Sequence, residues 1–184
     1  MAGYRSFLFP EASVFEDFLQ LDARESHHLI KVLRARVGDR VEVLDGRGKI
    51  YRGRIIEANS KSVGLDIVEV VESPPALPRV TLLQSITKGK TMDLVLRMGT
   101  EIGAALIQPI FTNHGEVQIK GDRLLSKVDK WEVTMIEACK QCGLPFLPQL
   151  GMPCSLDEWI RGNIQRKGQL RIVASLEEKS LPLG

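Results

Sequence analysis

The chain has 184 residues, of which 43% are hydrophobic and 26% charged, and its formal net charge is only +2. These values lie near the globular average, so they exclude a disordered tail, a collagen-like repeat and a coiled coil. No apolar run approaches the roughly 18 residues that a membrane span needs, and the N-terminus lacks the basic region of a signal peptide. Three cysteines suit a reducing compartment better than a disulfide framework, so we expect a soluble cytoplasmic protein with no membrane partner.

The clearest break in the chain is Ser73–Pro78, where three prolines rule out a helix and interrupt any strand pairing. We therefore predict a linker at 73–78 between one domain at 1–72 and another at 79–184. In the first domain, Asp22 and Glu25 have the spacing of a capping box, and the helix that follows is expected to end near Gly38. Turn chemistry and alternating apolar residues predict a small β-barrel around this helix. Its expected strands are Tyr4–Phe9, Val41–Val43, Ile50–Ile56 and Val63–Val71.

After the prolines the pattern changes to strand, helix and strand. Val80–Ile86 is a short apolar run, a helix capped by Thr91 and ended by Gly103 follows, and Ala105–Phe111 is the second strand. A crossover of this length implies that the two strands are parallel. Two more helices and a third strand are expected at Leu124–Cys142, Leu156–Ile160 and Leu170–Ala174. This half is therefore a parallel α/β domain, and we expect it to be incomplete at its C-terminus because doubly wound sheets usually continue.

Residues 31–54 form the densest basic segment, with eight basic side chains against three acidic ones. Arg34 and Arg36 follow the first helix, while Arg52 and Arg54 alternate along a strand, so each pair presents charge on one side, as phosphate contacts require. A solvated face explains the same pattern equally well. Because only 5% of the residues are aromatic, a stacking platform for single strands is not expected.

The turn Thr87–Thr91 is a second candidate for anion binding, since Lys88, Gly89 and Lys90 lie between the first strand and helix of the α/β half. Such a turn lies at the carboxyl edge of a sheet, where backbone N–H groups and the helix dipole favour phosphate. A P-loop needs a glycine five positions before Gly89, where this chain has Gln84, so the nucleotide-triphosphatase interpretation is disfavoured. An ordinary solvated turn is the stronger alternative.

Cys139 and Cys142 form a C-x-x-C pair, but both are predicted on the apolar stripe of one helix. No second pair or nearby histidine completes a tetrahedral site, so core packing is favoured over zinc or redox chemistry. His27 and His28 lie on the first helix and His114 follows the second strand of the α/β half, a scatter that predicts neither a catalytic triad nor a metal site.

Two series of short motifs carry a family resemblance. The first series is His28-Leu29, Val32-Leu33-Arg34, Gly38-Asp39 and Asp45-Gly46-Arg47-Gly48. The second is Gln84, Lys88-Gly89, Met92, Thr100-Glu101-Ile102-Gly103, Ile107, Pro109, Trp131 and Glu137-Ala138-Cys139-Lys140-Gln141-Cys142-Gly143. In order and spacing they resemble the ribosomal RNA small subunit methyltransferase E family across most of the chain.

This resemblance implies both a fold and an activity. The fold implied is a PUA-like RNA-binding barrel followed by a SPOUT-type α/β domain with a trefoil knot, acting as a homodimer. The activity implied is methylation of N3 of a uridine in small-subunit ribosomal RNA, with S-adenosylmethionine as cofactor and the RNA or the small subunit as partner. No general base is named, and Lys88, Glu101 and Gln141 are the candidates for the rim of the site. RNA contacts are expected from the basic residues Arg34, Arg36, Arg52, Arg54, Lys88 and Lys90.

The family's Gly-Pro-Glu-Gly-Gly loop and Leu-Gly-x-Arg-Ile-Leu-Arg segment thread the knot and hold the cofactor, and we expect both to lie beyond Gly184. The alternatives are therefore a non-catalytic RNA-binding module and a protein with no RNA partner. Loss of those elements is also expected to expose apolar parts of Val80–Ile86 and Leu170–Ala174, unless the tail Leu176–Gly184 folds across them.

Overall fold

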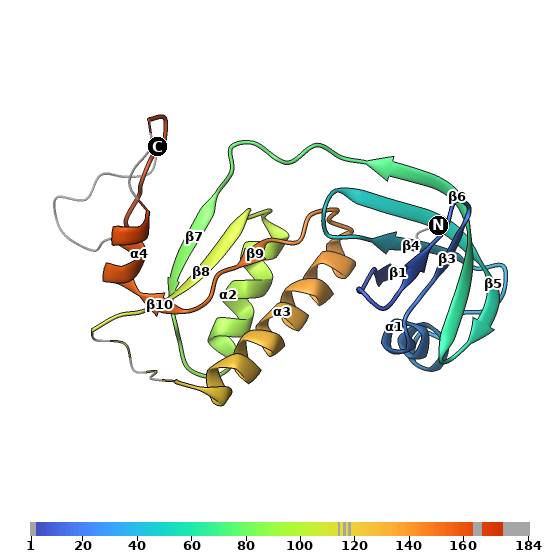
Figure 1. Ribbon diagram of the computed structural model, residues 1–184, viewed down its shortest axis with the longest axis horizontal. Helices are drawn as coiled ribbons and strands as arrows, with labels where there is room; N and C mark the ends of the chain where they lie inside the picture. Colours follow the sequence, from blue (N-terminus) through green and yellow to red (C-terminus); the bar gives the residue numbers. More distant parts are fainter. Residues whose placement is uncertain (1–2, 114, 116, 118, 164–166, 175–184) are drawn as a thin grey trace.

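The structure, a computed structural model, describes residues 3–113, 115, 117, 119–163 and 167–174. They form a six-stranded sheet in the N-terminal part and a four-stranded sheet in the C-terminal part (Figure 1). We call residues 3–72 the barrel and residues 79–174 the α/β half. Within the described ranges, no helix combines the length and the apolar character needed to cross a membrane.

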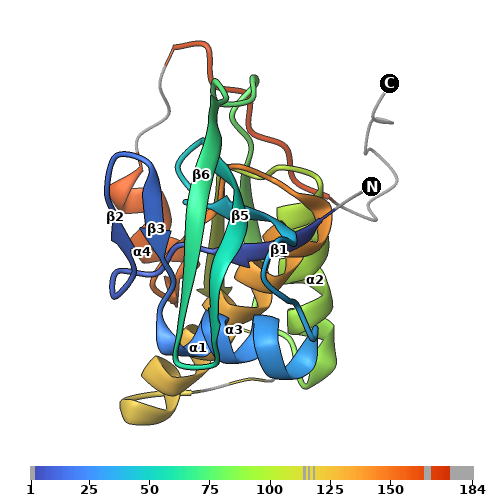
Figure 2. The same cartoon turned by 90° about the vertical axis from the view of Figure 1, so that its right-hand side faces the viewer.

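The barrel is built mainly from a long antiparallel hairpin, β5 and β6, which faces the viewer in Figure 2. Its strands are joined in the order β1-β4-β5-β6-β3-β2, and all pairs are antiparallel except β1 with β4. The strands in that order are Tyr4–Phe7, Arg40–Leu44, Lys49–Asn59, Ser62–Glu72, Phe18–Gln20 and Ser13–Val14. The predicted strands are thus confirmed, whereas β2 and β3 were missed because two or three residues are too few to show alternation.

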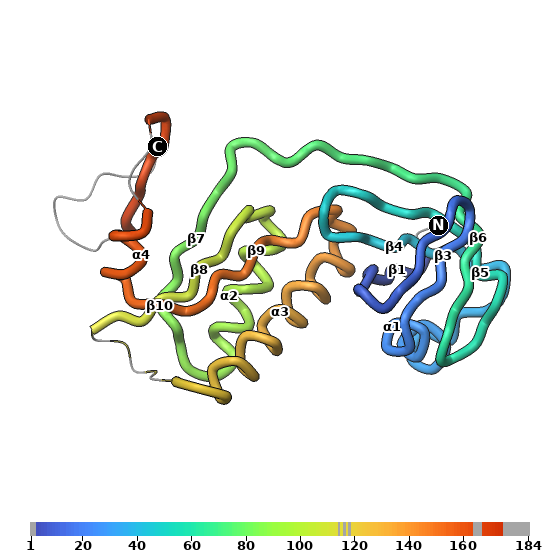
Figure 3. The backbone as a smooth tube through the Cα atoms, in the orientation of Figure 1, coloured from blue at the N-terminus to red at the C-terminus, as the bar shows by residue number. Residues whose placement is uncertain are grey.

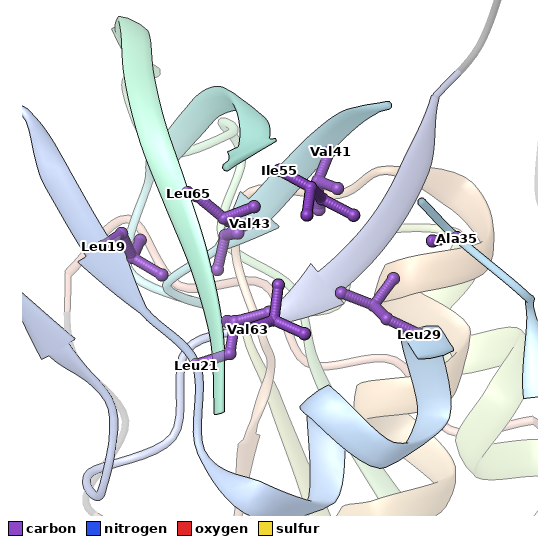
Figure 4. Close-up of a cluster of buried hydrophobic side chains, with 9 residues drawn as sticks. All are labelled: Leu19, Leu21, Leu29, Ala35, Val41, Val43, Ile55, Val63 and Leu65. Atoms are coloured by element: carbon purple, nitrogen blue, oxygen red, sulfur yellow. The ribbon is translucent and has the colours of Figure 1, made fainter. Parts of the chain in front are cut away.

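The core of the barrel follows from the alternation of apolar residues along these strands. In β4 and β6, the inward positions carry branched side chains that fill a pleated surface well. The buried cluster in Figure 4 consists of Leu19, Leu21, Leu29, Ala35, Val41, Val43, Ile55, Val63 and Leu65. Because these side chains come from both the sheet and the helical segment, the helix is held against the open side of the sheet.

The first helix is shorter than predicted. It consists of α1, Ala23–His27, and a π-helical turn, η1, over His28–Val32. Asp22 is the N-cap, as predicted, and its Oδ1 accepts hydrogen bonds from the backbone N–H groups of Arg24 (2.7 Å) and Glu25 (3.2 Å). The helix does not continue to Gly38, because Arg34 takes a left-handed conformation with φ 59° and ends it.

The α/β half has the predicted alternation of strand and helix. Its sheet has the order β10-β8-β7, with β9 also paired to β8, and every pairing is parallel, as the crossover length predicted. Helices α2 and α3 lie together between this sheet and the barrel (Figure 1). The elements are β7 Thr81–Ser85, α2 Lys90–Glu101, β8 Leu106–Phe111, α3 Asp122–Cys142, β9 Gln149–Leu150, β10 Cys154–Ser155 and α4 Leu156–Gly162.

Of the predicted helix ends in this half, the C-terminus of α3 is confirmed and the N-terminus of α2 is not. Gly143 ends α3 as predicted, since its φ of 68° is left-handed and its N–H bonds the carbonyl of Cys139. Thr91 does not cap α2. The N-cap is Gly89, with φ 60° and ψ −137°, so the helix begins before Thr91.

The predicted strand at Leu170–Ala174 is wrong. These residues have no regular structure, and Leu170 is 81% and Val173 84% exposed, so no neighbouring strand pairs with them. The exposure expected for this segment and for Val80 is found, although Ile86 is buried. The tail Leu176–Gly184 lies outside the described residues, as does His114.

Candidate functional site

The carboxyl edge of the parallel sheet gathers hydroxyl groups from two neighbouring strands. Ser85 ends β7 and Thr112 directly follows β8, and their hydroxyl oxygens lie 3.1 Å apart. The hydroxyl oxygen of Thr87 is also buried, and it has no hydrogen-bond partner among the described residues. In open α/β sheets this edge is where ligands bind, so three hydroxyls, one of them unsatisfied among the described residues, make it the candidate site.

The turn that begins at Thr87 was a predicted anion site, whereas Ser85 and Thr112 were not predicted, although a signal for them existed. Each one lies at or just after the end of a predicted parallel strand, and residues at such ends meet at one edge of the sheet.

The N-termini of both long helices lie at this same edge of the α/β half (Figure 1). Gly89 before α2 and Gly121 before α3 have nearly the same backbone conformation, with φ 60° and 58°, and no described side chain caps either helix. The first backbone N–H groups of each helix are therefore open to an acceptor, and the helix dipoles are positive there. Exposed basic residues flank the two glycines in the sequence: Lys88, Lys90, Lys120 and Arg123.

The three predicted rim residues do not lie together. Lys88 precedes α2 and Glu101 ends it, so a helix about 18 Å long separates them. Gln141 lies near the C-terminus of α3, and its carbonyl accepts a hydrogen bond from Arg5 of β1 at 2.8 Å. Lys88 belongs to the carboxyl edge, whereas Glu101 and Gln141 lie at the opposite end of the helices, which faces the barrel.

An open hollow of about 520 Å³ lies at that opposite end. Its charges are largely matched: Arg5 pairs with Glu42 at 3.2 Å, and Arg97 lies 3.7 Å from Glu101. A hollow with balanced charge offers little to an anion, so it is a weaker candidate than the carboxyl edge. Residues from both halves line it, among them Arg5, His28, Arg97, Glu137, Lys140 and Gln141.

On the barrel, the two predicted arginine pairs differ in how far their charges are available. The guanidinium of Arg52 contacts Glu42 and Glu69, both at 3.1 Å, and these hydrogen bonds, that to Glu69 first, raise the pKa of Arg52. Arg54 donates to the carbonyl of Gly38 at 3.3 Å. The carboxylates therefore offset much of the positive potential that β5 presents.

Arg34 and Arg36 are more available. Both are exposed, while Ala35 between them is buried in the barrel core, so the backbone is anchored and both guanidinium groups point to solvent. The N–H of Arg36 donates to Asp39 Oδ2 at 2.7 Å, which further orders this turn. Within the described part of the chain, neither guanidinium forms an ion pair.

The cysteines occupy different environments, contrary to the prediction that both lie on the apolar stripe. Cys139 is fully buried, as predicted, whereas Cys142 is exposed. Burial, with a smaller contribution from Cys142, raises the pKa of Cys139 to about 12, and its thiol donates to the carbonyl of Phe146 at 3.5 Å. The described residues contain no group of His, Cys, Asp and Glu side chains that could hold a metal ion, and His27 and His28 lie at the turn from α1 into η1.

Comparison with protein families divides the chain as the structure does. Residues 74–182, more than half of the chain, match an RNA methyltransferase domain, and residues 21–68 match an RNA methyltransferase PUA domain.

Curated relatives share the name ribosomal RNA small subunit methyltransferase E. The protein of Buchnera aphidicola from Acyrthosiphon pisum is 29% identical over 150 residues, which cover 79% of this chain and 58% of the relative. That of Aquifex aeolicus is 32% identical over 114 residues, covering 61% and 49%. The chain thus spans about half the length of the curated relatives that it matches.

Solved structures agree with this relationship. The putative methyltransferase Lpg2936 of Legionella pneumophila, in complex with the cofactor SAM, superposes with a TM-score of 0.80 at 28% identity, covering 89% of this chain and 67% of that one. A ribosomal RNA small subunit methyltransferase E of Neisseria gonorrhoeae, bound to S-adenosyl methionine, has a TM-score of 0.77 at 26% identity, covering 86% and 65%. The PUA-like barrel followed by a SPOUT-type α/β domain is thereby confirmed, and the chain belongs to the ribosomal RNA small subunit methyltransferase E family.

Proposed function

We propose that this protein methylates small-subunit ribosomal RNA with S-adenosylmethionine as methyl donor, and that the target is N3 of a uridine. The order of the two matched domains carries the proposal, because it joins an RNA methyltransferase PUA domain to an RNA methyltransferase domain in one chain. The match over residues 74–182 favours an enzyme over a non-catalytic RNA-binding module.

The carboxyl edge fits part of such a cofactor. S-adenosylmethionine carries ribose hydroxyls and a carboxylate, which need hydrogen-bond donors and acceptors, and it supplies an electrophilic methyl group when bound. Ser85, Thr87 and Thr112 offer hydroxyls there, and the buried oxygen of Thr87 has no hydrogen-bond partner among the described residues. We assign these three residues to one wall of the cofactor site, where they bind and orient the cofactor.

The RNA is held, in this proposal, by phosphate contacts from the barrel. Arg34 and Arg36 are its main contacts, because no carboxylate of the described residues forms an ion pair with either guanidinium, and Arg52 and Arg54 contribute less. Lys88 and Lys90 then meet the RNA at the carboxyl edge. Phosphate contacts fix register and orientation, so the identity of the modified nucleotide depends on other groups.

The activity is tested by incubating the protein with isotopically labelled S-adenosylmethionine and small-subunit RNA or subunits that lack methylation. We expect label in 3-methyluridine, mapped by nuclease digestion and mass spectrometry. Label in another nucleotide would retain the methyltransferase and overturn the uridine N3 assignment, and no transfer to any RNA would overturn the activity.

The cofactor wall has a separate test in binding calorimetry. Thr87→Val removes the unsatisfied hydroxyl while keeping the shape of the side chain, and we expect S-adenosylmethionine to bind about threefold to tenfold more weakly. Thr81→Val is the matched control, because Thr81 is exposed at the start of β7, the strand that precedes Thr87. An equal effect of the two substitutions would contradict the assignment of Thr87.

The RNA face is tested by the salt dependence of binding. Arg34→Ala with Arg36→Ala should reduce the slope of log affinity against log salt by about 1.4 for single-stranded RNA, since each lost phosphate contact lowers it by roughly 0.7. Arg52→Ala should change the slope less than alanine substitution of either Arg34 or Arg36 alone. An unchanged slope in the double variant would show that the RNA binds to another surface of the protein.

We also propose that the protein is a homodimer and that it is located in the cytoplasm. Sedimentation tests the homodimer, and cell fractionation tests the location.

A further inference from the structure

A buried ion pair joins the barrel to the α/β half. Lys140 Nζ near the end of α3 lies 2.9 Å from Glu25 Oε1 of α1, and the two residues are 115 positions apart in the sequence. The side chains are only 6% and 2% exposed. Two opposite charges from different halves of the protein therefore meet away from water.

The pair is completed by hydrogen bonds from both halves. The second carboxylate oxygen of Glu25 accepts from the Ser6 hydroxyl at 2.6 Å and from the Phe7 N–H at 3.1 Å, both in β1. Lys140 also contacts Glu137, one turn earlier on α3, at 2.8 Å. Every partner is supplied by β1, α1 or α3, so the full set exists only when these elements lie in one arrangement.

Apolar contacts and backbone hydrogen bonds also join the two halves around the ion pair. A buried cluster combines Phe7, Leu44 and Ile50 of the barrel with Ile136 and Cys139 of α3. The backbone of the turn before β5 also bonds the segment after α3, since the Leu147 N–H donates to the Gly46 carbonyl and the Gly48 N–H to the Pro145 carbonyl, both at 3.0 Å. Figure 3 shows residues 73–80 passing from the barrel to β7, and the segment after α3 lying beside the turn between β4 and β5.

The apolar cluster and the buried ion pair constrain the docking of the two halves differently. Hydrophobic contact is non-directional, so the apolar cluster tolerates sliding and rotation of one half against the other, and the two backbone hydrogen bonds are local to the turn before β5 and the segment after α3. A buried charge does not, because any displacement that removes a partner leaves it unpaired in a medium of low dielectric. The ion pair therefore penalises every orientation except the one in which Glu25 and Lys140 meet.

We propose that Glu25 and Lys140 are positioning residues that hold the barrel and the α/β half as one rigid body. The pair then sets the distance between the barrel face at Arg34 and Arg36 and the sheet edge at Ser85 and Thr112. Its consequence for RNA rests on the proposed function: a nucleotide can reach the sheet edge only if it lies a fixed distance along the RNA from the phosphates that the barrel holds.

The orientation of the two halves is measured by residual dipolar couplings of backbone amides in the partly aligned protein, without RNA or cofactor. In the unmodified protein, one alignment tensor should describe both the barrel and the α/β half. Lys140→Met keeps most of the aliphatic stem but leaves Glu25 unpaired, and Glu25→Leu with Lys140→Met removes both charges. In each variant we expect two tensors, with the degree of order of one half at least twofold lower than that of the other.

Lys49→Met is the matched control, since Lys49 pairs with Glu72 at 2.8 Å entirely within the barrel, and it should keep one tensor. The double variant decides the question even if Lys140→Met alone fails to fold. A common tensor in the double variant would overturn the proposal, because the apolar and backbone contacts would then suffice, and two tensors in the unmodified protein would overturn it as well. Failure of the protein to bind RNA would contradict the proposed function but would not change the conclusion drawn from the alignment tensors.

Discussion

The junction between the two halves and the outer face of the barrel each hold a lysine–glutamate pair, yet the pairs differ in what they do. Lys140 and Glu25 lie 2.9 Å apart with side chains 6% and 2% exposed, and Lys49 and Glu72 lie 2.8 Å apart with side chains 47% and 68% exposed. The separation is almost equal, but water screens the outer pair and is excluded from the inner one. Burial and the number of further hydrogen bonds, and not distance, decide how much an ion pair constrains the fold.

The largest expected effect sharpens this comparison directly. Lys140→Ala should lower the free energy of unfolding by about 3–5 kcal/mol, because it leaves the Glu25 carboxylate buried without its partner. Lys49→Ala should leave stability unchanged within the error of a urea titration, because its pair is exposed. Equal losses in the two variants would show that burial does not distinguish the pairs.

Cysteine labelling probes the junction from the neighbouring turn of α3. Burial raises the pKa of Cys139 to about 12 and shields its sulfur, so maleimide should react much more slowly with Cys139 than with the exposed Cys142. Site-resolved mass spectrometry separates the two thiols and Cys154. In Lys140→Met the rate at Cys139 should rise as the junction opens, and comparable rates at both cysteines in the unmodified protein would mean that the junction is already open.

A substitution deep in the barrel tests whether the junction couples the halves. Leu65 is 1% exposed, so Leu65→Ala should cost about 2–5 kcal/mol through lost contacts and a cavity. The two tryptophans, Trp131 and Trp159, both lie in the α/β half and report on its unfolding. Their fluorescence transition should shift by the same urea concentration as the circular dichroism. A tryptophan transition at an unchanged urea concentration would show that the halves unfold independently, and would contradict the coupling of the halves through the junction.

The smallest expected effect lies far from the junction, at the capping box of α4. The Ser155 hydroxyl bonds the Glu158 N–H at 3.2 Å, and Glu158 Oε2 accepts from the N–H and hydroxyl of Ser155, both at 2.8 Å. Ser155→Ala should weaken α4 by about 1 kcal/mol, seen as faster amide exchange in α4 and unchanged exchange in the barrel. Faster amide exchange in the barrel as well would mean that α4 and the barrel are coupled by contacts other than those of the junction.

This effect has a defined pH dependence. Hydrogen bonds from the backbone and then the side chain of Ser155 lower the pKa of Glu158. Stability from a carboxyl with a lowered folded pKa is fully present above its unfolded pKa and is lost as the pH falls through the folded value. The cost of Ser155→Ala should therefore be largest near neutral pH and shrink below the ordinary carboxyl range, and a cost that grew in acid would contradict the hydrogen-bond explanation.

Much of each half was predictable because its signals are local. Alternating valines predict β4, a stripe of apolar residues ended by Gly143 predicts α3, and the length of the connection between β7 and β8 requires parallel strands. The short strands β9 and β10 and the early end of the first helix at Arg34 were not predictable, since they depend on neighbours elsewhere in the chain.

Glu25 shows the limit of such reasoning most clearly. Its spacing from Asp22 predicts a capping box, but in the folded protein its carboxylate bonds Ser6, Phe7 and Lys140. The sequence by itself determined the family, the order of the two domains and most of their regular elements, because periodicity, turn residues and motifs act over a few positions. Only the tertiary structure decided that Arg52 is matched by carboxylates and that Glu25 meets Lys140, because each of these encounters depends on which surfaces packing brings together.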